Sequence, residues 1–149
     1  DRVLPAGVLT RRQAMMILPY ENGVVKVRLS GRELVEVVEH SLSALGPENS
    51  SFPQVSRLRL RYDPGKPPGQ RLLQLLVGDQ PVRPEGSYTF ACSEFIRKGG
   101  CGYEMLPKAR LLVEPHDAPA EGVALIEYLH RHKLVSPRLE GRIQAVTDR

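Results

Sequence analysis

The stretch VKVRLSGRELVEVVEHSLSAL, residues 25–45, contains a strand pattern followed directly by a helix pattern. Apolar side chains occupy alternate positions of residues 25–29, which is the period of a half-buried strand. Ser30 and Glu33 then form a capping box, in which each side chain satisfies a free backbone N–H at the start of a helix. Beyond it, apolar residues recur three or four positions apart, which predicts an amphipathic helix over 31–44.

A second capping box lies upstream. Thr10 and Gln13 have the same spacing, and they predict a short helix over 11–18. Pro19 ends this helix, because a proline disfavours the helical conformation in the residue before it. Residues 20–23, with the sequence YENG, are expected to form a turn that leads into the first strand.

Downstream of residue 45, strand-like runs alternate with loops. We expect a loop over 46–54, strands at 58–62, 72–77, 87–92, 111–113 and 140–146, and a helix capped by Asp117. Strands and helices are mixed without a regular strand–helix–strand alternation. This order favours an α+β fold with a mixed sheet over a doubly wound parallel sheet.

Composition narrows the class of protein. The chain has 149 residues, which is a usual size for one domain. Its 41% hydrophobic and 26% charged residues exclude a disordered chain, a collagen and a disulfide scaffold. No run approaches the roughly 20 apolar residues that a membrane-spanning helix needs. The net charge of +4 fits an anionic ligand without requiring one, and two cysteines fit either redox compartment.

Motifs for self-sufficient catalysis are absent from the sequence. It has no GxSxG elbow, no phosphate-binding GxxxxGK[ST] loop and no HExxH metal motif. His130 and His132 would point about 200° apart on a helix, since each residue turns about 100°. They are therefore expected to be solvated, and no metal site is expected within this chain.

A basic stripe is the one feature that suggests a nucleic acid. Arg57, Arg59 and Arg61 alternate along the strand expected at 58–62, and such a face could contact phosphates. Only 5% of the residues are aromatic, and none interleaves with the stripe. A solvated sheet face is the simpler interpretation, and no nucleic-acid partner is expected.

The glycine-rich run FIRKGGCGY, residues 95–103, is the most suggestive stretch for ligand binding. Three glycines in four positions allow left-handed backbone or a close approach to a ligand. Phe95 could present a flat face to a ring, or it could lie in the core beside a tight turn. A redox role for Cys92 and Cys101 is a further alternative, although only nearby basic residues favour an activated thiol.

Several runs together resemble the C-terminal domain of the 5′-nucleotidase family. LPYEN (18–22) and VRLSG (27–31) resemble the LPFxN and xLxG runs of that family. FPQVS (52–56), followed by YD (62–63), matches next in the same order. GGCGY (99–103) resembles the family's GGDGY, and EGRI (140–143) resembles its closing EGRI. The order and approximate spacing are kept from about Gly7 to Ile143. Each run is weak alone, but the set is fairly specific.

The resemblance implies an architecture and a role. The family includes ecto-5′-nucleotidase and bacterial UDP-sugar hydrolases, whose N-terminal metallophosphatase domain holds two divalent metals and performs the hydrolysis. Their C-terminal domain binds the nucleoside. Residues 1–149 would then be a single domain of this second kind, with helices and a mixed sheet in α/β/β/α layers. The resemblance also implies an extracellular or periplasmic protein. The lack of a long apolar run predicts no transmembrane segment within this chain.

By the same resemblance, the chain would be the substrate domain of a metal-dependent enzyme that releases phosphate from nucleotides or related phosphoesters. Its partners would be a nucleoside or nucleotide and the metallophosphatase domain, which is expected to hold the two metals. The family's N-G-G-x-x-R segment would fall just before Asp1, so the domain is expected to lack its first segment. The isolated chain would contain no catalytic residues and bind no metal.

The resemblance assigns site residues one by one. Tyr20 stands at the Phe of LPF, one side of an aromatic clamp on the base, and Phe95 stands at the other side. Asn22 matches the asparagine of LPFxN. Gly99, Gly100, Cys101 and Gly102 match the loop at the ribose. Cys101 replaces an Asp that accepts hydrogen bonds from the ribose hydroxyls, and a thiol is a weak acceptor. The alternative is a non-catalytic ligand-binding or structural module whose site has decayed.

Overall fold

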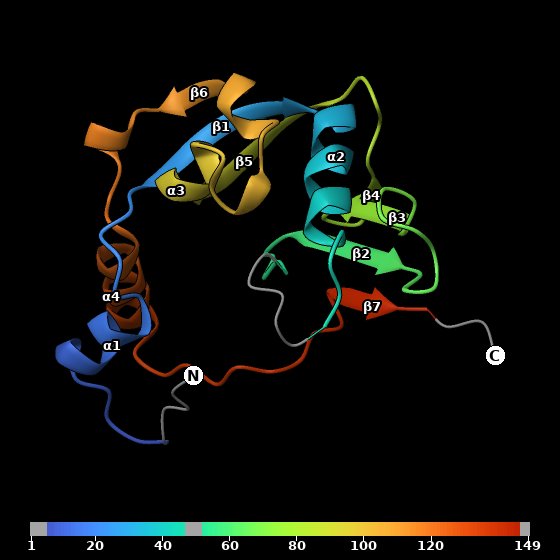
Figure 1. Ribbon diagram of the computed structural model, residues 1–149. Helices are drawn as coiled ribbons and strands as arrows, with labels where there is room; N and C mark the ends of the chain where they lie inside the picture. The colour runs from blue at the N-terminus through green and yellow to red at the C-terminus, as the bar shows by residue number, and fades with distance from the viewer. Residues whose placement is uncertain (1–5, 47–51, 147–149) are drawn as a thin grey trace.

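A computed structural model describes residues 6–46 and 52–146 of the chain (Figure 1). Its helices are α1 (Arg11–Ile17), α2 (Gly31–Ser41), α3 (Glu94–Arg97) and α4 (Glu121–His132). Its strands are β1 (Val24–Ser30), β2 (Leu58–Tyr62), β3 (Leu72–Val77), β4 (Gln80–Pro81), β5 (Ser87–Ser93), β6 (Arg110–Val113) and β7 (Ile143–Ala145). Short 3₁₀ turns are η1 (Gly100–Gly102), η2 (Leu106–Lys108) and η3 (Pro115–Asp117). The α+β class is confirmed.

The strands form two sheets. One has the order β5-β1-β6 and is antiparallel throughout. The other has the order β4-β3-β2-β7 and is mixed, because β7 runs parallel to β2 while the remaining pairs are antiparallel. In Figure 1 the two sheets lie on either side of α2. The segment that links β5 to β6 includes α3 and η1, and α3 packs against β1 and β5 (Figure 1).

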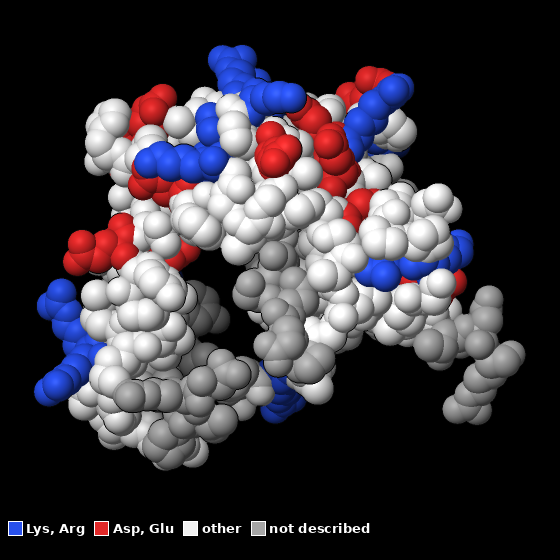
Figure 2. Space-filling model, viewed as in Figure 1, with Lys and Arg blue, Asp and Glu red and all other residues white. Residues whose placement is uncertain are grey.

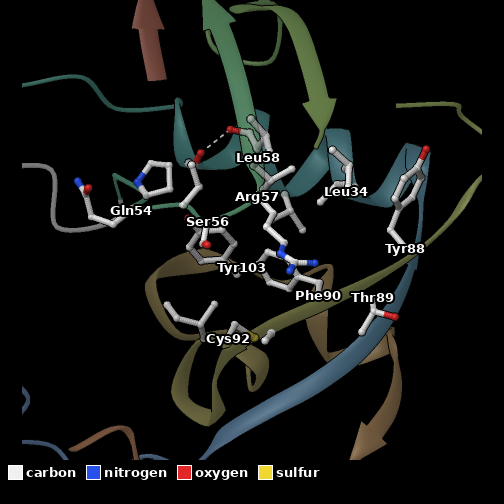
Figure 3. A pocket seen from close by; sticks show the side chains of 18 of the residues that line it. Leu34, Gln54, Ser56, Arg57, Leu58, Tyr88, Thr89, Phe90, Cys92 and Tyr103 are labelled. Atoms are coloured by element: carbon white, nitrogen blue, oxygen red, sulfur yellow. Dashed lines mark hydrogen bonds between the residues drawn. The ribbon is translucent and has the colours of Figure 1, made fainter. Parts of the chain in front are cut away.

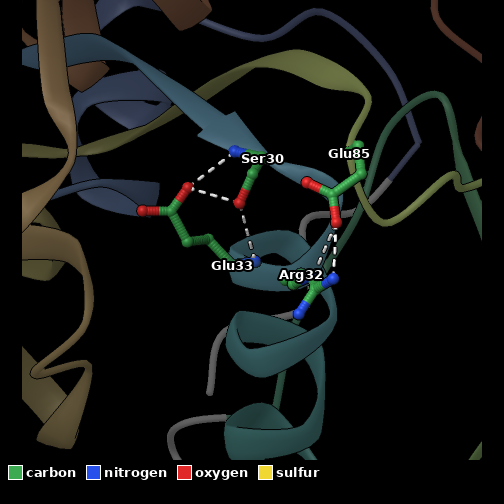
Figure 4. A network of polar contacts seen from close by, with 4 residues as sticks. All are labelled: Ser30, Arg32, Glu33 and Glu85. Atoms are coloured by element: carbon green, nitrogen blue, oxygen red, sulfur yellow. Dashed lines mark hydrogen bonds and ion pairs between the residues drawn. The ribbon is translucent and has the colours of Figure 1, made fainter.

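The helix α2 begins as its capping box predicts (Figure 4). The Ser30 N–H and hydroxyl both donate to one carboxylate oxygen of Glu33, at 2.6 and 2.7 Å, while the Glu33 N–H donates to the Ser30 hydroxyl at 3.3 Å. The backbone bond from Ser30, followed by the hydroxyl bond, lowers the pKa of Glu33 below its ordinary value, and slight burial opposes the shift. The box of Thr10 and Gln13 at α1 is present as well.

Gly31 is required where α2 meets the turn before β5. A Cβ at this position would lie 1.9 Å from the carbonyl oxygen of Arg83. The Gly31 N–H donates to the Gly86 carbonyl at 3.0 Å, and the Arg32 N–H donates to the Pro84 carbonyl at 3.1 Å. Two helix-start N–H groups are thus satisfied by the turn, and no side chain fits between them.

The hydrophobic core lies between α2 and the inner faces of both sheets. Its most deeply buried members are Val27, Leu29, Leu34, Val38, Leu42, Leu60 and Leu106. The apolar stripe expected on α2 therefore faces this core. The helices α1 and α4 pack on each other at one side of the molecule, away from α2 (Figure 1). No helix of the described segments is long and apolar enough to cross a membrane.

The start of α4 and the length of β7 differ from expectation. Asp117 does not cap α4: its N–H donates to Glu114 within η3, and α4 begins after Ala120. The helix begins later than expected because residues 119–120 stay extended. The Pro119 carbonyl accepts a hydrogen bond from the Val24 N–H, and Ala120 forms an isolated β-bridge with Gly23. The closing strand is confined to the three residues that pair with β2. Residues 47–51 of the loop expected at 46–54 lie outside the described residues.

Candidate functional site

The register of β1 and β5 brings together the two segments expected to hold the aromatic rings. Val24 pairs with Ser93, so the chain before β1 and the chain after β5 leave the same end of the sheet. Pairing continues one step further, because the Glu94 N–H donates to the Gly23 carbonyl at 2.8 Å. Tyr20 precedes this junction by three residues and Phe95 follows it by one. Both are therefore attached to one end of the three-stranded sheet.

Both rings lie at the surface. The exposed fraction is 72% for Tyr20 and 51% for Phe95, so Phe95 is not a core residue. Each ring is therefore accessible to a ligand. Asn22 lies in the same segment, which is extended into the bridge between Gly23 and Ala120 instead of forming the expected turn. The Asn22 carbonyl accepts from the Glu121 N–H at 2.9 Å, which fixes this segment against the start of α4.

The glycine loop follows Phe95 and folds back against it. A Cβ at Gly100 would lie 2.5 Å from Cε1 of the Phe95 ring, so the ring rests on the Gly100 backbone. Gly99 and Gly102 have φ angles of +95° and +79°, in the left-handed region that glycine adopts without strain. The loop thus supports the face of the ring that points away from solvent.

Cys101 adopts the left-handed conformation too, with φ +53° and ψ +26°. Few residues other than glycine do so, although Asp and Asn are among those that tolerate it best. The side chain is exposed and its thiol is free. The position therefore projects a side chain from the loop into solvent, beside the glycines.

Cys92 differs from Cys101. Burial raises the pKa of its thiol to about 11; Arg97 opposes this rise, and Glu121 adds to it. The nucleophile in thiol chemistry is the thiolate. Cys92 is thus protonated at neutral pH, and the redox alternative gains no support from it.

His40 is a site residue that the sequence did not reveal. Its Nε2 lies 2.9 Å from the carbonyl oxygen of Cys101, and its ring meets the edge of the Tyr103 ring with centroids 4.5 Å apart. A carbonyl oxygen can only accept, so Nε2 carries the hydrogen. The sequence offered no signal for this contact, because His40 lies 61 residues from its partner along the chain.

A cavity of about 710 Å³ lies behind the glycine loop, between α2, the residues before β2, and β5 (Figure 3). Its wall is mostly apolar and includes Leu34, Val38, Leu58, Phe90, Ile96 and Tyr103. Tyr20, Phe95 and Cys101 do not line it. Ile96 and Tyr103 do, and they flank the site in sequence. The cavity is therefore lined by sequence neighbours of the loop but not by the two exposed rings.

The arginine stripe is shorter than its spacing predicts. Arg57 has φ +59°, precedes β2 and lines the cavity, where Figure 3 shows it extending toward Phe90. Only Arg59 and Arg61 remain on the exposed face of the strand. In Figure 2, basic and acidic side chains are interspersed over the visible face. The described residues thus give little support to a continuous phosphate-contacting stripe.

Metal ligands do not gather in the described part of the chain. No three side chains of His, Cys, Asp or Glu among residues 6–46 and 52–146 lie close enough to hold an ion. The nearest acid–histidine pair is His116 and Asp117, 3.4 Å apart and exposed. These residues do not fit a two-metal hydrolytic centre.

Comparisons with known proteins agree with the fold. The family model of the 5′-nucleotidase C-terminal domain matches residues 1–108. The 5′-nucleotidase of Homo sapiens is 28% identical over 150 residues, covering 95% of this chain and 26% of that protein. The apyrase of Tabanus yao is 32% identical over 111 residues, covering 67% of this chain and 20% of that protein. The chain thus spans about a quarter of the length of its curated relatives.

Solved structures give the same picture. The 5′-nucleotidase precursor from Thermus thermophilus superposes with a TM-score of 0.87 at 29% identity, covering 95% of this chain and 28% of that one. The NAD nucleotidase of Haemophilus influenzae superposes with a TM-score of 0.75 at 18% identity, over 93% of this chain and 27% of that one. The second likeness shows the fold alone.

Proposed function

Since the chain belongs to the 5′-nucleotidase C-terminal domain family, we propose that it is the nucleoside-binding domain of a phosphohydrolase. The parent protein would release phosphate from nucleotides or related phosphoesters. Relatives that carry the name 5′-nucleotidase match nearly the whole chain while extending well beyond it. The domain supplies substrate recognition, and the hydrolytic step belongs to the remainder of the parent.

The observation that carries this proposal is the pair of exposed rings at one end of the β1–β5 pair. Tyr20 and Phe95 come from segments joined by the bond between Glu94 and Gly23. A base that stacks on such rings needs only its flat faces, so the site accepts different bases. Stacking of one base on an aromatic side chain contributes about 1–3 kcal/mol. Tyr20 keeps the flat face of a phenylalanine and adds a hydroxyl group.

The glycine loop would bind the ribose. Gly99, Gly100 and Gly102 bring the backbone to the surface without side chains, next to the ring of Phe95. Cys101 projects from the same loop, and Asn22 lies across the junction. A base on Phe95 would therefore place its sugar near the loop. Because a thiol accepts hydrogen bonds weakly, the ribose would be held less firmly than by a carboxylate at this position.

Two divalent metals would act in the parent's metallophosphatase domain, where they supply the charge stabilisation for attack on phosphorus. This chain contributes to that chemistry only by binding and orienting the nucleoside end of the substrate. The partners of the domain are thus the nucleotide and the metal-bearing domain of the same protein.

Calorimetry with three probes tests the binding role. The chain is titrated with adenosine, with AMP and with inorganic phosphate. Because the recognised group is the nucleoside, adenosine and AMP should bind with similar affinity, and phosphate should give no heat of binding. Saturable phosphate binding without adenosine binding would contradict the proposal.

A non-catalytic module is the second candidate, and Cys101 is the observation that favours it. A protein that keeps the fold but has lost the acceptor on the ribose loop could bind another ligand or serve a structural role. Phosphate release from AMP by the parent protein distinguishes the two. Hydrolysis that a metal chelator abolishes supports the enzyme, whereas adenosine binding without hydrolysis supports the module.

A further inference from the structure

We propose that His40 is a positioning residue: its hydrogen bond to the Cys101 carbonyl holds the glycine loop in its ligand-binding shape and thereby sets nucleoside affinity. The effect of His40 on the loop stands by itself, whereas its effect on nucleoside affinity rests on the proposed function. His40 belongs to α2, far from the loop in sequence, and acts on the ligand through Cys101.

The loop needs such a tie because its backbone is unusual. Gly99, Cys101 and Gly102 all have positive φ angles, and one of the three is not a glycine. A non-glycine residue in the left-handed region is less stable than in the right-handed one, and it persists only where its surroundings hold it. The His40 bond reaches the carbonyl of that same residue, at 2.9 Å.

The His40 ring also packs closely on Gly102. A Cβ at Gly102 would lie 3.0 Å from Cε1 of His40, so the missing side chain eases the approach of the ring. The ring also makes a T-shaped contact with the ring of Tyr103, which is buried. Burial raises the pKa of the Tyr103 hydroxyl, which therefore stays neutral beside the histidine. The contacts with Gly102 and Tyr103 thus hold the His40 ring in position for its hydrogen bond to the loop.

Two rings from different elements consequently hold the loop at successive peptides. Phe95 of α3 rests on Gly100, and His40 of α2 holds Cys101 and Gly102. A shift of the loop would alter the surface under the Phe95 ring as well as the backbone next to the ribose. His40 should therefore influence both the stacking and the sugar contacts, although it lies outside the aromatic pair.

The first measurement follows the loop without any ligand. Hydrogen–deuterium exchange is measured for the amides of residues 99–104 in the wild type, His40→Leu and His40→Gln, with His130→Leu, an exposed histidine on α4, as the control. Leucine fills similar space but donates nothing, whereas the glutamine amide can still donate. We expect about fivefold faster loop exchange in His40→Leu, the factor that corresponds to one net hydrogen bond, and near wild-type exchange in His40→Gln and in the control.

The second measurement follows adenosine binding in the same variants, together with their melting temperatures. His40→Leu should raise the adenosine Kd about fivefold, and His40→Gln should restore it, at melting temperatures close to that of the wild type. Unchanged exchange and affinity in His40→Leu would overturn the inference. Equal impairment in both variants with lower melting temperatures would also overturn it, because packing rather than the bond would then be responsible.

The two measurements separate the inference from the proposed function. If the wild type does not bind adenosine, the proposed function fails, and the exchange data alone decide whether His40 holds the loop. If adenosine binds but His40→Leu neither loosens the loop nor weakens binding, the positioning role fails while the proposed function stands.

Discussion

Cys101 shows how much a single side chain on the glycine loop could determine. Its backbone is left-handed and its thiol is exposed, so the position presents a side chain to solvent beside the glycines. The similarity to GGDGY identified this position from the sequence. The conformation could not be deduced in the same way, because a cysteine does not by itself indicate positive φ.

Replacement of Cys101 by Asp should tighten adenosine binding by roughly tenfold or more, since a hydrogen bond to a charged group contributes about 1.5–3 kcal/mol. Cys101→Asn is the matched control, because Asn tolerates the same backbone but carries no charge. Calorimetry of both variants gives the comparison. An unchanged Kd in Cys101→Asp would mean that the loop does not contact the sugar.

At the scale of elements, local patterns in the sequence were sufficient to predict most of the helices and strands. Both capping boxes are confirmed, and α2 ends within three residues of its expected end. The predicted start of α4 was wrong, because a long-range bridge between Gly23 and Ala120 holds the chain extended past Asp117. The contact of His40 with the loop was missed for the same reason. Features set by distant segments leave no local periodicity to detect.

The start of α2 allows a direct comparison of two neighbouring residues. Gly31→Ala would place a methyl group against the Arg83 carbonyl, and overpacking of this kind costs about 1–3 kcal/mol of unfolding free energy. Arg32→Ala removes the 2.5 Å ion pair with Glu85, which is exposed and contributes at most about 1 kcal/mol. Chemical denaturation of both variants measures the difference. Equal losses would show that the turn at 83–86 does not pack on α2.

The capping box of α2 should make stability depend on pH. The ordinary pKa of Glu33, which applies to the unfolded chain, is 4.5. In the folded protein, hydrogen bonds from Ser30 hold the pKa of Glu33 below that value. The stabilisation is therefore complete above the unfolded pKa and is lost as pH falls through the folded one. Glu33→Gln keeps an acceptor that does not titrate. The wild type should melt above this variant at pH 7, and the gap should shrink at pH 3; a gap that is constant with pH would contradict this account.

At the scale of the whole molecule, the proposed site lies where three parts of the fold meet. The β1–β5 pair supplies the two ring-bearing segments, α2 supplies His40, and the start of α4 fixes Asn22. The order of strands and helices indicated the α+β class, and the family resemblance proposed Tyr20 and Phe95 as the two rings. The sequence did not indicate which strands belong to each of the two sheets around α2, because strand pairing between distant segments has no signature in either strand alone.

The central claim is that the domain binds a nucleoside between or upon the exposed rings of Tyr20 and Phe95. Calorimetric titration of adenosine into the wild type, Phe95→Ala and Tyr128→Ala tests it most directly. Tyr128 is a half-exposed aromatic residue on α4 and serves as the matched control. The account predicts that Phe95→Ala weakens binding about tenfold or more, consistent with the loss of one stacked base, while Tyr128→Ala binds as the wild type does. Equal adenosine affinity in all three proteins, or no adenosine binding by the wild type, would contradict it.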